Sequence, residues 1–305
     1  MNERQLWVPG EGHTLDSEYP VPSTEQLCEE WQAYAGGDVQ PAPGVFGAVR
    51  VPEAPPSAYA SIDLCEVVRQ THMSIRLVED VSGEAPVPMV NYAQGLSFGE
   101  QPGTPLTPET NQLIRRDVTS VAQVLINAGL VHPVEHVEAI GSVLRSWRAL
   151  GVYVLANTST LPGCEPGTIR FLQEYLPDGF DGLLLPRNWD GALPLTKGLA
   201  ARNVIESFTP ADAPVPAVKV DDAEHHLSSF HDALAESPSV SAVATFMPTY
   251  EGNPVHDTSV LADTPFAAFM QAREYLHAQL GVDAPAAQTP RILQSLGGRA
   301  TAGMA

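Results

Sequence analysis

The stretch GVYVLANTS, residues 151–159, is the most informative segment of this chain. An apolar run at 152–155 leads directly into the small polar residues Asn157, Thr158 and Ser159. A short apolar run of this kind is typical of a buried strand. Ligands bind at the carboxyl ends of the strands in parallel α/β sheets. The stretch therefore predicts a buried strand that ends in ligand-binding groups, although a loop start or a helix cap would also explain Thr158.

The rest of the chain alternates apolar runs with helix-like segments. The expected strands after residue 159 are 180–186, 213–220 and 241–246, and the expected helices are 167–176, 197–208, 223–236 and 264–281. Before residue 151, a strand at 87–90 and two helices within 110–150 are expected. Strands that alternate with helices are typical of a parallel α/β sheet. We therefore expect an α/β fold with a three-layer, doubly wound parallel sheet and a Rossmann-like core.

Prolines are frequent before this expected core. We expect residues 1–80 to form an irregular, Pro-rich N-terminal extension with one short helix in STEQLCEEWQAYAGG, residues 23–37. Residues 81–255 would then form the α/β core, and residues 256–305 a C-terminal helix and tail. The extension is interpreted as an arm that lies over the core or binds a protein partner.

Composition and charge exclude several classes of function. The chain has 305 residues and a formal net charge of −20, which disfavours a nucleic-acid face and an anionic membrane surface. No apolar run approaches the roughly 18–20 residues of a membrane-spanning helix. The three cysteines, Cys28, Cys65 and Cys164, are far apart and odd in number, so no disulfide framework is expected. Together with the absence of an apolar leader segment, these features predict an acidic, cytoplasmic protein.

Three element boundaries carry groups that suit a phosphate ester and a divalent cation. Thr158 ends a strand, Lys197 begins a helix, and Asp221 and Asp222 follow another strand. An ammonium group and a hydroxyl donate to phosphate oxygens, and carboxylates hold Mg²⁺. A surface lysine and two helix-capping aspartates are the alternative interpretation. The hypothesis assigns Mg²⁺ to Asp221 and Asp222, and the phosphorylated ligand to Asn157, Thr158, Ser159 and Lys197.

In this order, the segments resemble motifs of the haloacid dehalogenase (HAD) superfamily of phosphohydrolases. VYVLANTS (152–159) is similar to the second motif, TKGLAARNVIE (196–206) to the third and AVKVDDAEHH (217–226) to the fourth. The resemblance covers about residues 85–250. It implies a Rossmann-like core, Mg²⁺, and catalytic roles for Thr158 and Lys197.

The first motif of that superfamily is a nucleophilic Asp at the end of the first strand, an acid/base Asp two residues later, and then Gly-Thr. The matching place here is VPMVNYAQGLSF (87–98), which puts Asn91 and Ala93 at the two aspartate positions. An amide is a poor nucleophile, and Ala93 has no proton to transfer. Asp63, in SIDLC, is the other candidate nucleophile, but no apolar strand is expected before it.

These residues lead to three hypotheses. The first is a HAD-like protein that binds a small phosphorylated ligand, a nucleotide or another phosphomonoester, without hydrolysing it. The second is an active Mg²⁺-dependent phosphohydrolase, which requires a carboxylate at the position given to Asn91. The third is a non-catalytic interaction or structural protein on the same fold, for which the N-terminal extension argues.

Histidines provide two further patterns. Residues His132, Glu135 and His136 match the H-x-x-E-H pattern of some zinc peptidases, but a solvated first helical turn is the favoured interpretation. His226 follows the acidic pair closely, together with His225 and, further along, His231. His226 could lie near the acidic pair, but a helix surface is the favoured interpretation for these side chains.

Overall fold

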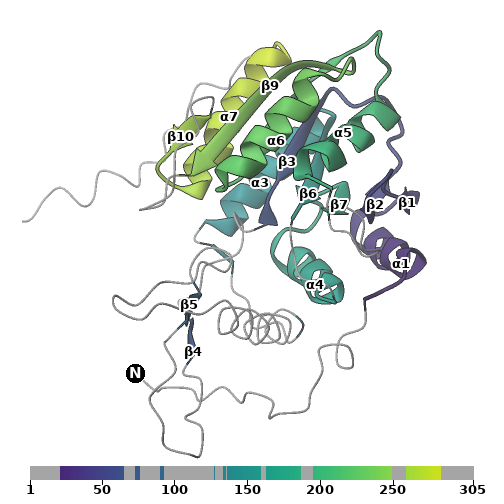
Figure 1. The fold of residues 1–305 in the computed structure, drawn as a ribbon, viewed down its shortest axis with the longest axis vertical. Helices are drawn as coiled ribbons and strands as arrows, with labels where there is room; N and C mark the ends of the chain where they lie inside the picture. Colours follow the sequence, from purple (N-terminus) through teal and green to yellow (C-terminus); the bar gives the residue numbers. More distant parts are fainter. Residues whose placement is uncertain are drawn as a thin grey trace, which may run out of the picture.

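A computed structural model describes most of the expected core. The described residues are 21–64, 73–75, 90–92, 127, 133–134, 136–158, 163–186, 195–248 and 259–282. Within them, an eight-stranded sheet has the order β1-β2-β7-β6-β3-β8-β9-β10 (Figure 1). Its strands are β1 (Val39–Pro41), β2 (Phe46–Arg50), β3 (Ala58–Ile62), β6 (Val152–Asn157), β7 (Gly182–Leu185), β8 (Val215–Val220), β9 (Val240–Pro248) and β10 (Val260–Ala262). From β7 to β10 all neighbouring strands are parallel, whereas β1 and β2 add an antiparallel edge.

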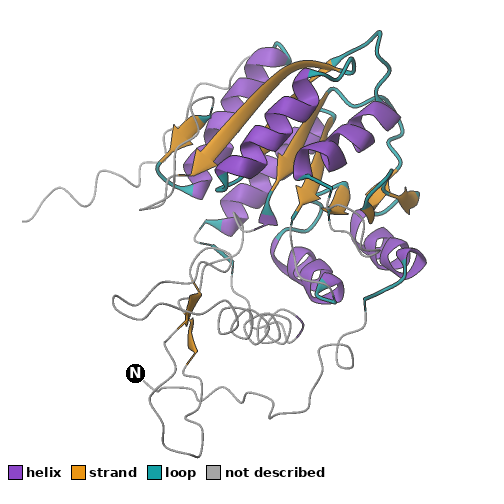
Figure 2. Ribbon diagram, viewed as in Figure 1, coloured by secondary structure: helices purple, strands orange, loops and turns teal. Residues whose placement is uncertain are grey.

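Helices cover both faces of this sheet (Figure 2). The helices are α1 (Thr24–Ala35), α3 (Val137–Ala149), α4 (Glu165–Tyr175), α5 (Lys197–Phe208), α6 (Glu224–Ala235) and α7 (Pro265–Gln279). One core layer contains buried side chains of α1, α3, α4 and α7, and the other contains those of α5 and α6. The expected α/β fold with a mostly parallel, three-layer arrangement is therefore confirmed.

The central strand β3 has the short sequence AYASI, and all five residues are buried. Side chains alternate between the two faces of a strand. Ala58, Ala60 and Ile62 belong to the core layer of α3 and α7, whereas Tyr59 belongs to the layer of α5 and α6. β6 and β8 flank β3 on its two sides, and the chain winds outward from β3 in both directions. Such a reversal of strand order opens a crevice at the carboxyl ends of the strands, where ligands bind.

The expected irregular extension over residues 1–80 is wrong for residues 21–64, since α1, β1, β2 and β3 belong to the core. Ser23 begins α1, and its side chain and that of Gln26 bond reciprocally to each other's backbone N–H groups. Pro41 lies in β1 at the sheet edge, where a missing N–H donor is tolerated. Prolines thus punctuate the connections of the sheet rather than an arm. The boundary expected at 255 is also wrong, because β10 and α7 belong to the same sheet and core.

The expected first strand at 87–90 is also corrected. β5 (Val90–Tyr92) pairs antiparallel with β4 (Met73–Ile75) in a separate two-stranded sheet, where Asn91 is in register with Ser74. The place between β6 and β8 belongs to β3 instead. Apart from Asn127, the helix expected near 110–130 lies outside the described residues. In the part of the chain that the structure describes, no helix combines the length and apolarity needed to cross a membrane.

Candidate functional site

Asp63 follows the last residue of β3 and lies at the centre of the carboxyl edge of the sheet. Its backbone N–H donates to the carbonyl of Val220 in β8 at 3.0 Å, which continues the strand pairing by one residue. The side chain is buried, with 7% exposed. One carboxylate oxygen accepts a hydrogen bond from the hydroxyl of Thr158 at 3.4 Å, and the other contacts the ammonium group of Lys197. The carboxylate is thus held between a neutral donor and a cation.

Asn157 and Thr158, at the end of β6, have different roles. Asn157 is fully buried, and its amide donates to the Ser61 hydroxyl at 3.2 Å and to the backbone carbonyl of Lys197 at 2.8 Å. The amide nitrogen therefore ties the ends of β3 and β6 to the start of α5, which is a structural role. Thr158 reaches Asp63, whereas Ser159 lies outside the described residues.

Lys197 is the first residue of α5, and the close packing of that helix against α6 explains why the Lys197 side chain is buried. Thr196 caps the helix by accepting the N–H of Leu199 at 3.2 Å. Gly198 packs so closely against α6 that an added Cβ would lie 1.9 Å from the carbonyl oxygen of Ser229. The Lys197 side chain is only 2% exposed. Burial lowers its pKa to about 8, although the carboxylates of Asp221 and Asp222 oppose that shift.

Asp221 follows β8 and is completely buried. Its Oδ2 lies 3.1 Å from the ammonium nitrogen of Lys197 and 3.0 Å from that of Lys219. Its Oδ1 accepts the backbone N–H of Ala223 at 3.0 Å and lies 3.2 Å from Nδ1 of His226. Burial disfavours ionisation of this carboxyl, but the two ammonium groups and His226 outweigh burial and hold its pKa well below the usual value. The N-cap residue of α6 is Ala223 and no side chain caps this helix, so the predicted capping role of Asp221 and Asp222 is wrong for the described structure.

Lys219 is a site residue that the sequence reasoning missed. It lies in β8 two residues before Asp221 and shares its face, and its side chain is completely buried. The ammonium group forms an ion pair with Asp221 and lies 5.7 Å from the ring centroid of Phe230 in α6. A lysine within an otherwise apolar strand, AVKV, was the available signal, because a buried ammonium group requires a charged or aromatic partner.

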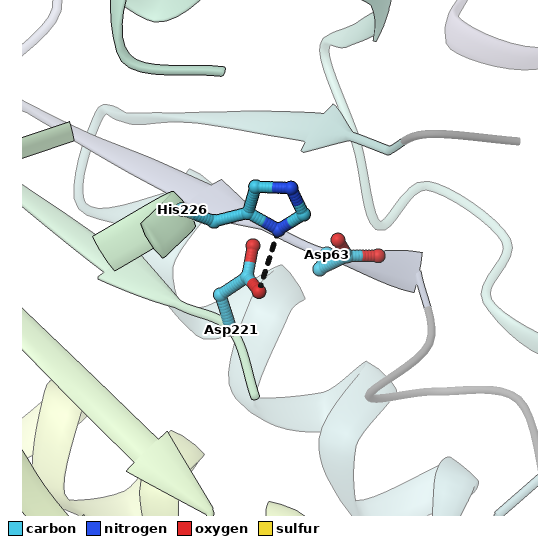
Figure 3. Close-up of side chains that lie close together, drawn as sticks. All are labelled: Asp63, Asp221 and His226. Carbon is cyan, nitrogen blue, oxygen red and sulfur yellow. Dashed lines mark hydrogen bonds and ion pairs between the residues drawn. The ribbon is translucent and has the colours of Figure 1, made fainter. Parts of the chain in front are cut away.

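Three potential metal ligands gather at this edge, and they are not the predicted pair. Asp63, Asp221 and His226 each offer one ligand atom, and all three atoms lie within 4.8 Å of one another. Figure 3 shows His226 reaching from α6 over Asp221, with Asp63 entering from the end of β3. Asp222 is half-buried and is not part of this group.

His226 corrects a second expectation, since it does not lie on an exposed helix surface. Its side chain is 23% exposed and faces Asp221. Burial lowers its pKa, and the Asp221 carboxylate opposes that shift. His231 lies on the helix surface, as expected, with 41% of its side chain exposed. Of the H-x-x-E-H pattern, His136 is exposed at the start of α3, and the residues at 132 and 135 lie outside the described part of the chain.

The assembled groups have complementary chemistry. A buried carboxylate faces a hydroxyl and an ammonium group, and a second carboxylate lies beside them. Positioned groups that neutralise negative charge are what phosphoryl transfer requires, and an ammonium group and a hydroxyl are groups of that kind. Comparisons with known protein families, curated proteins and solved structures find no match to this chain.

Proposed function

We propose that this chain is a HAD-like phosphohydrolase that acts on small phosphomonoesters and uses Asp63 as its nucleophile. The observation that carries this proposal is the position of Asp63 at the end of the central strand, in contact with Thr158 and Lys197. The hypothesis of ligand binding without hydrolysis depended on Asn91 at that position. With a carboxylate there, hydrolysis is the better-supported alternative.

The order of the elements supports the same proposal. Thr158 comes from β6 on one side of β3, and Asp221 from β8 on the other, while Lys197 reaches both carboxylates from α5. Each segment that resembles the second, third or fourth HAD motif therefore contributes a side chain that lies at Asp63 or beside it. The first motif is then assigned to the end of β3 rather than to 87–98.

The chemistry of the proposed reaction has two steps. In the first, a carboxylate oxygen of Asp63 attacks phosphorus, an aspartyl phosphate forms, and the bond to the leaving oxygen breaks. The Thr158 hydroxyl and the Lys197 ammonium group donate to phosphoryl oxygens, whose negative charge they stabilise. In the second step, water attacks phosphorus, inorganic phosphate leaves, and the Asp63 carboxylate is restored. Asp221 keeps Lys197 in place throughout.

The proton for the leaving oxygen sets a limit on the substrate. The residue two positions after Asp63 is Cys65, where the resemblance implies an acid/base Asp. A thiol has a reference pKa of about 8.5, against about 3.9 for an Asp side chain. Once it holds a proton, the carboxyl of an Asp therefore gives a larger driving force for proton transfer to a departing alkoxide than a thiol does. We propose that the preferred substrates have leaving groups that need little protonation, such as aryl phosphates and phosphoanhydrides.

A divalent cation fits the charge of the centre. The carboxylates of Asp63 and Asp221 balance the ammonium groups of Lys197 and Lys219, so the four groups sum to zero. A phosphate dianion adds two negative charges, which a divalent cation would neutralise in this buried place. Asp63 and Asp221 supply the oxygen ligands that such a cation requires. When bound, it would stabilise charge on the phosphoryl oxygens.

A measurement of phosphate release from phosphate esters tests the proposal. The purified full-length chain is assayed with p-nitrophenyl phosphate, nucleotides and sugar phosphates. Each assay is run once with added divalent cation and once with a chelator that removes it. Asp63→Asn is the test variant, and Asp212→Asn, an exposed aspartate between α5 and β8, is the matched control. We expect turnover in the wild type and in the control, and none in Asp63→Asn. Equal turnover in the two variants would refute Asp63 as the nucleophile.

A further inference from the structure

We infer that the cation centre of this chain takes a first-row transition-metal ion, such as Mn²⁺, Co²⁺ or Zn²⁺, with the imidazole of His226 as a ligand beside Asp63 and Asp221. The inference rests on the proposed function, because it concerns the cation of the same site. It differs from the Mg²⁺ pair of Asp221 and Asp222 expected from the sequence.

The geometry of the three side chains supports a shared ion. Nδ1 of His226 lies 3.2 Å from Oδ1 of Asp221 (Figure 3). Two ligand atoms bound at about 2.1 Å to the same ion lie about 3 Å apart when they are neighbours in the coordination shell. The ligand atom of Asp63 lies within 4.8 Å of the other two, so only a small closure would bring all three to bonding distance.

The chemistry of the ligands selects the class of ion. Mg²⁺ prefers oxygen ligands and keeps several of its waters. Imidazole nitrogen suits later ions such as Zn²⁺, and affinity for a site with nitrogen ligands rises from Mn²⁺ to Co²⁺. Mn²⁺ also takes oxygen ligands, so in a mixed site of two carboxylates and one imidazole it is the ion of this class that resembles Mg²⁺ most. Nδ1 of His226 coordinates when the ring carries its proton on Nε2, and Asp221 beside it then acts as a second ligand rather than as a hydrogen-bond acceptor.

The two oxygens of the Asp221 carboxylate have different partners. Lys197 and Lys219 both contact Oδ2, whereas His226 faces Oδ1, which it shares with the N–H of Ala223. Oδ1 is thus the oxygen available to a cation. The two ammonium groups also cancel the charge of the carboxylates, which weakens a purely electrostatic site for Mg²⁺. A neutral imidazole adds a coordinate bond that does not depend on that charge.

Metal binding by the full-length chain, without substrate, tests the inference. Titration calorimetry with Mn²⁺ alone and with Mg²⁺ alone compares the wild type with His226→Gln and His231→Gln. His231 is the matched control, since it lies in the same helix α6, pairs with Asp232 and is not part of the three-residue group. We expect His226→Gln to weaken Mn²⁺ binding at least about 100-fold, because loss of a ligand exceeds the 10–100-fold effects of outer-shell changes. Binding of Mg²⁺ should change little, and His231→Gln should bind both ions like the wild type.

A second measurement needs no variant. Electron spin-echo modulation of Mn²⁺ bound to the unmodified chain detects a directly coordinated imidazole nitrogen. We expect this nitrogen signal in the wild type and no such signal in His226→Gln. Mn²⁺ binding without a nitrogen signal, or equal losses of Mn²⁺ and Mg²⁺ affinity in His226→Gln, would overturn the inference.

The outcomes also separate this inference from the proposed function. If His226→Gln keeps its Mn²⁺ affinity but loses phosphate release and one limb of its pH profile, His226 is an acid/base group. The inference then fails, and the proposed phosphohydrolase stands. If Mn²⁺ binds through His226 but no phosphate ester is turned over with any ion, the inference stands and the proposed function fails.

Discussion

Replacement of Asp221 by Asn tests the charge balance of the site most sharply. Asp221 is completely buried and pairs with two ammonium groups that are themselves 2% and 0% exposed, Lys197 and Lys219. In Asp221→Asn, Lys197 keeps its contact with Asp63, whereas Lys219 loses the carboxylate it pairs with in the described structure. One uncompensated buried charge costs about 3–5 kcal/mol of unfolding free energy.

Removal of both charges should cost much less. Lys219→Met replaces the ammonium group with an apolar side chain of similar length, and Asp221→Asn/Lys219→Met leaves no uncompensated charge on either residue. Buried ion pairs replaced by apolar groups are often neutral for stability. We expect the double variant to be about 2–4 kcal/mol more stable than Asp221→Asn. Such a recovery would indicate a strong coupling energy between two residues in contact.

Urea denaturation of the four proteins at neutral pH, followed by circular dichroism, measures these free energies. In thermal unfolding, Asp221→Asn should melt roughly 10 °C below the wild type, at about 2–4 °C for each kcal/mol in a domain of this size. A coupling energy near zero, with the double variant no more stable than Asp221→Asn, would refute the assignment of Lys219 as the partner of Asp221.

The other predictions concern pH, packing and the leaving group. The lowered pKa of Lys197, about 8, predicts that inorganic phosphate binds more weakly as pH rises above about 8, and calorimetry in Lys197→Met should show no such pH dependence. The effect on stability has the opposite sign: the contribution of Lys197 to the unfolding free energy should increase as the pH rises from about 8 to the ordinary lysine pKa of 10.5, since the unfolded chain binds the extra proton in that range. Gly198→Ala should lower the unfolding free energy by at least about 1–3 kcal/mol, because the added carbon meets backbone of α6 at Ser229, whereas Gly141→Ala in α3 meets only side chains and should be nearly neutral. Cys65→Asp should raise turnover of alkyl phosphates at least about 100-fold while it changes aryl phosphates little, as leaving-group assays will show.

Much of the fold follows from local pattern. The strands β6, β7, β8 and β9 and the helices α4 to α7 agree with the expected segments within a few residues, because their apolar periods are clear. β3 was missed because AYASI contains alanines and serine, which are weak strand formers on their own. Its position depends on packing between β6 and β8, where small side chains fit beneath helices on both faces. The run at 87–90 is more apolar, yet its last residue begins β5 in the two-stranded pair.

The candidate site, like the fold, could be predicted from the sequence only in part. Thr158, Lys197 and Asp221 could be chosen from the sequence because each stands at the boundary of a recognisable element. Asp63 could not be preferred over Asn91, since that choice depends on which strand lies at the centre of the sheet. His226 joins the site through the direction in which α6 leaves β8, and Lys219 through the facing of one strand residue. The direction of α6 is a three-dimensional fact that a linear pattern does not contain, whereas the lysine within the apolar run AVKV was a signal that the sequence did offer.

The identity of the nucleophile is the central claim, and covalent trapping tests it most directly. The full-length chain is mixed with a phosphate ester and divalent cation, quenched, and treated with borohydride, which reduces an aspartyl phosphate to homoserine. Peptide mass spectrometry then locates the reduced residue. We predict homoserine at position 63 in the wild type and unmodified Asn in Asp63→Asn, which should also release no phosphate. Homoserine at another aspartate, or phosphate release that persists in Asp63→Asn, would contradict the proposal.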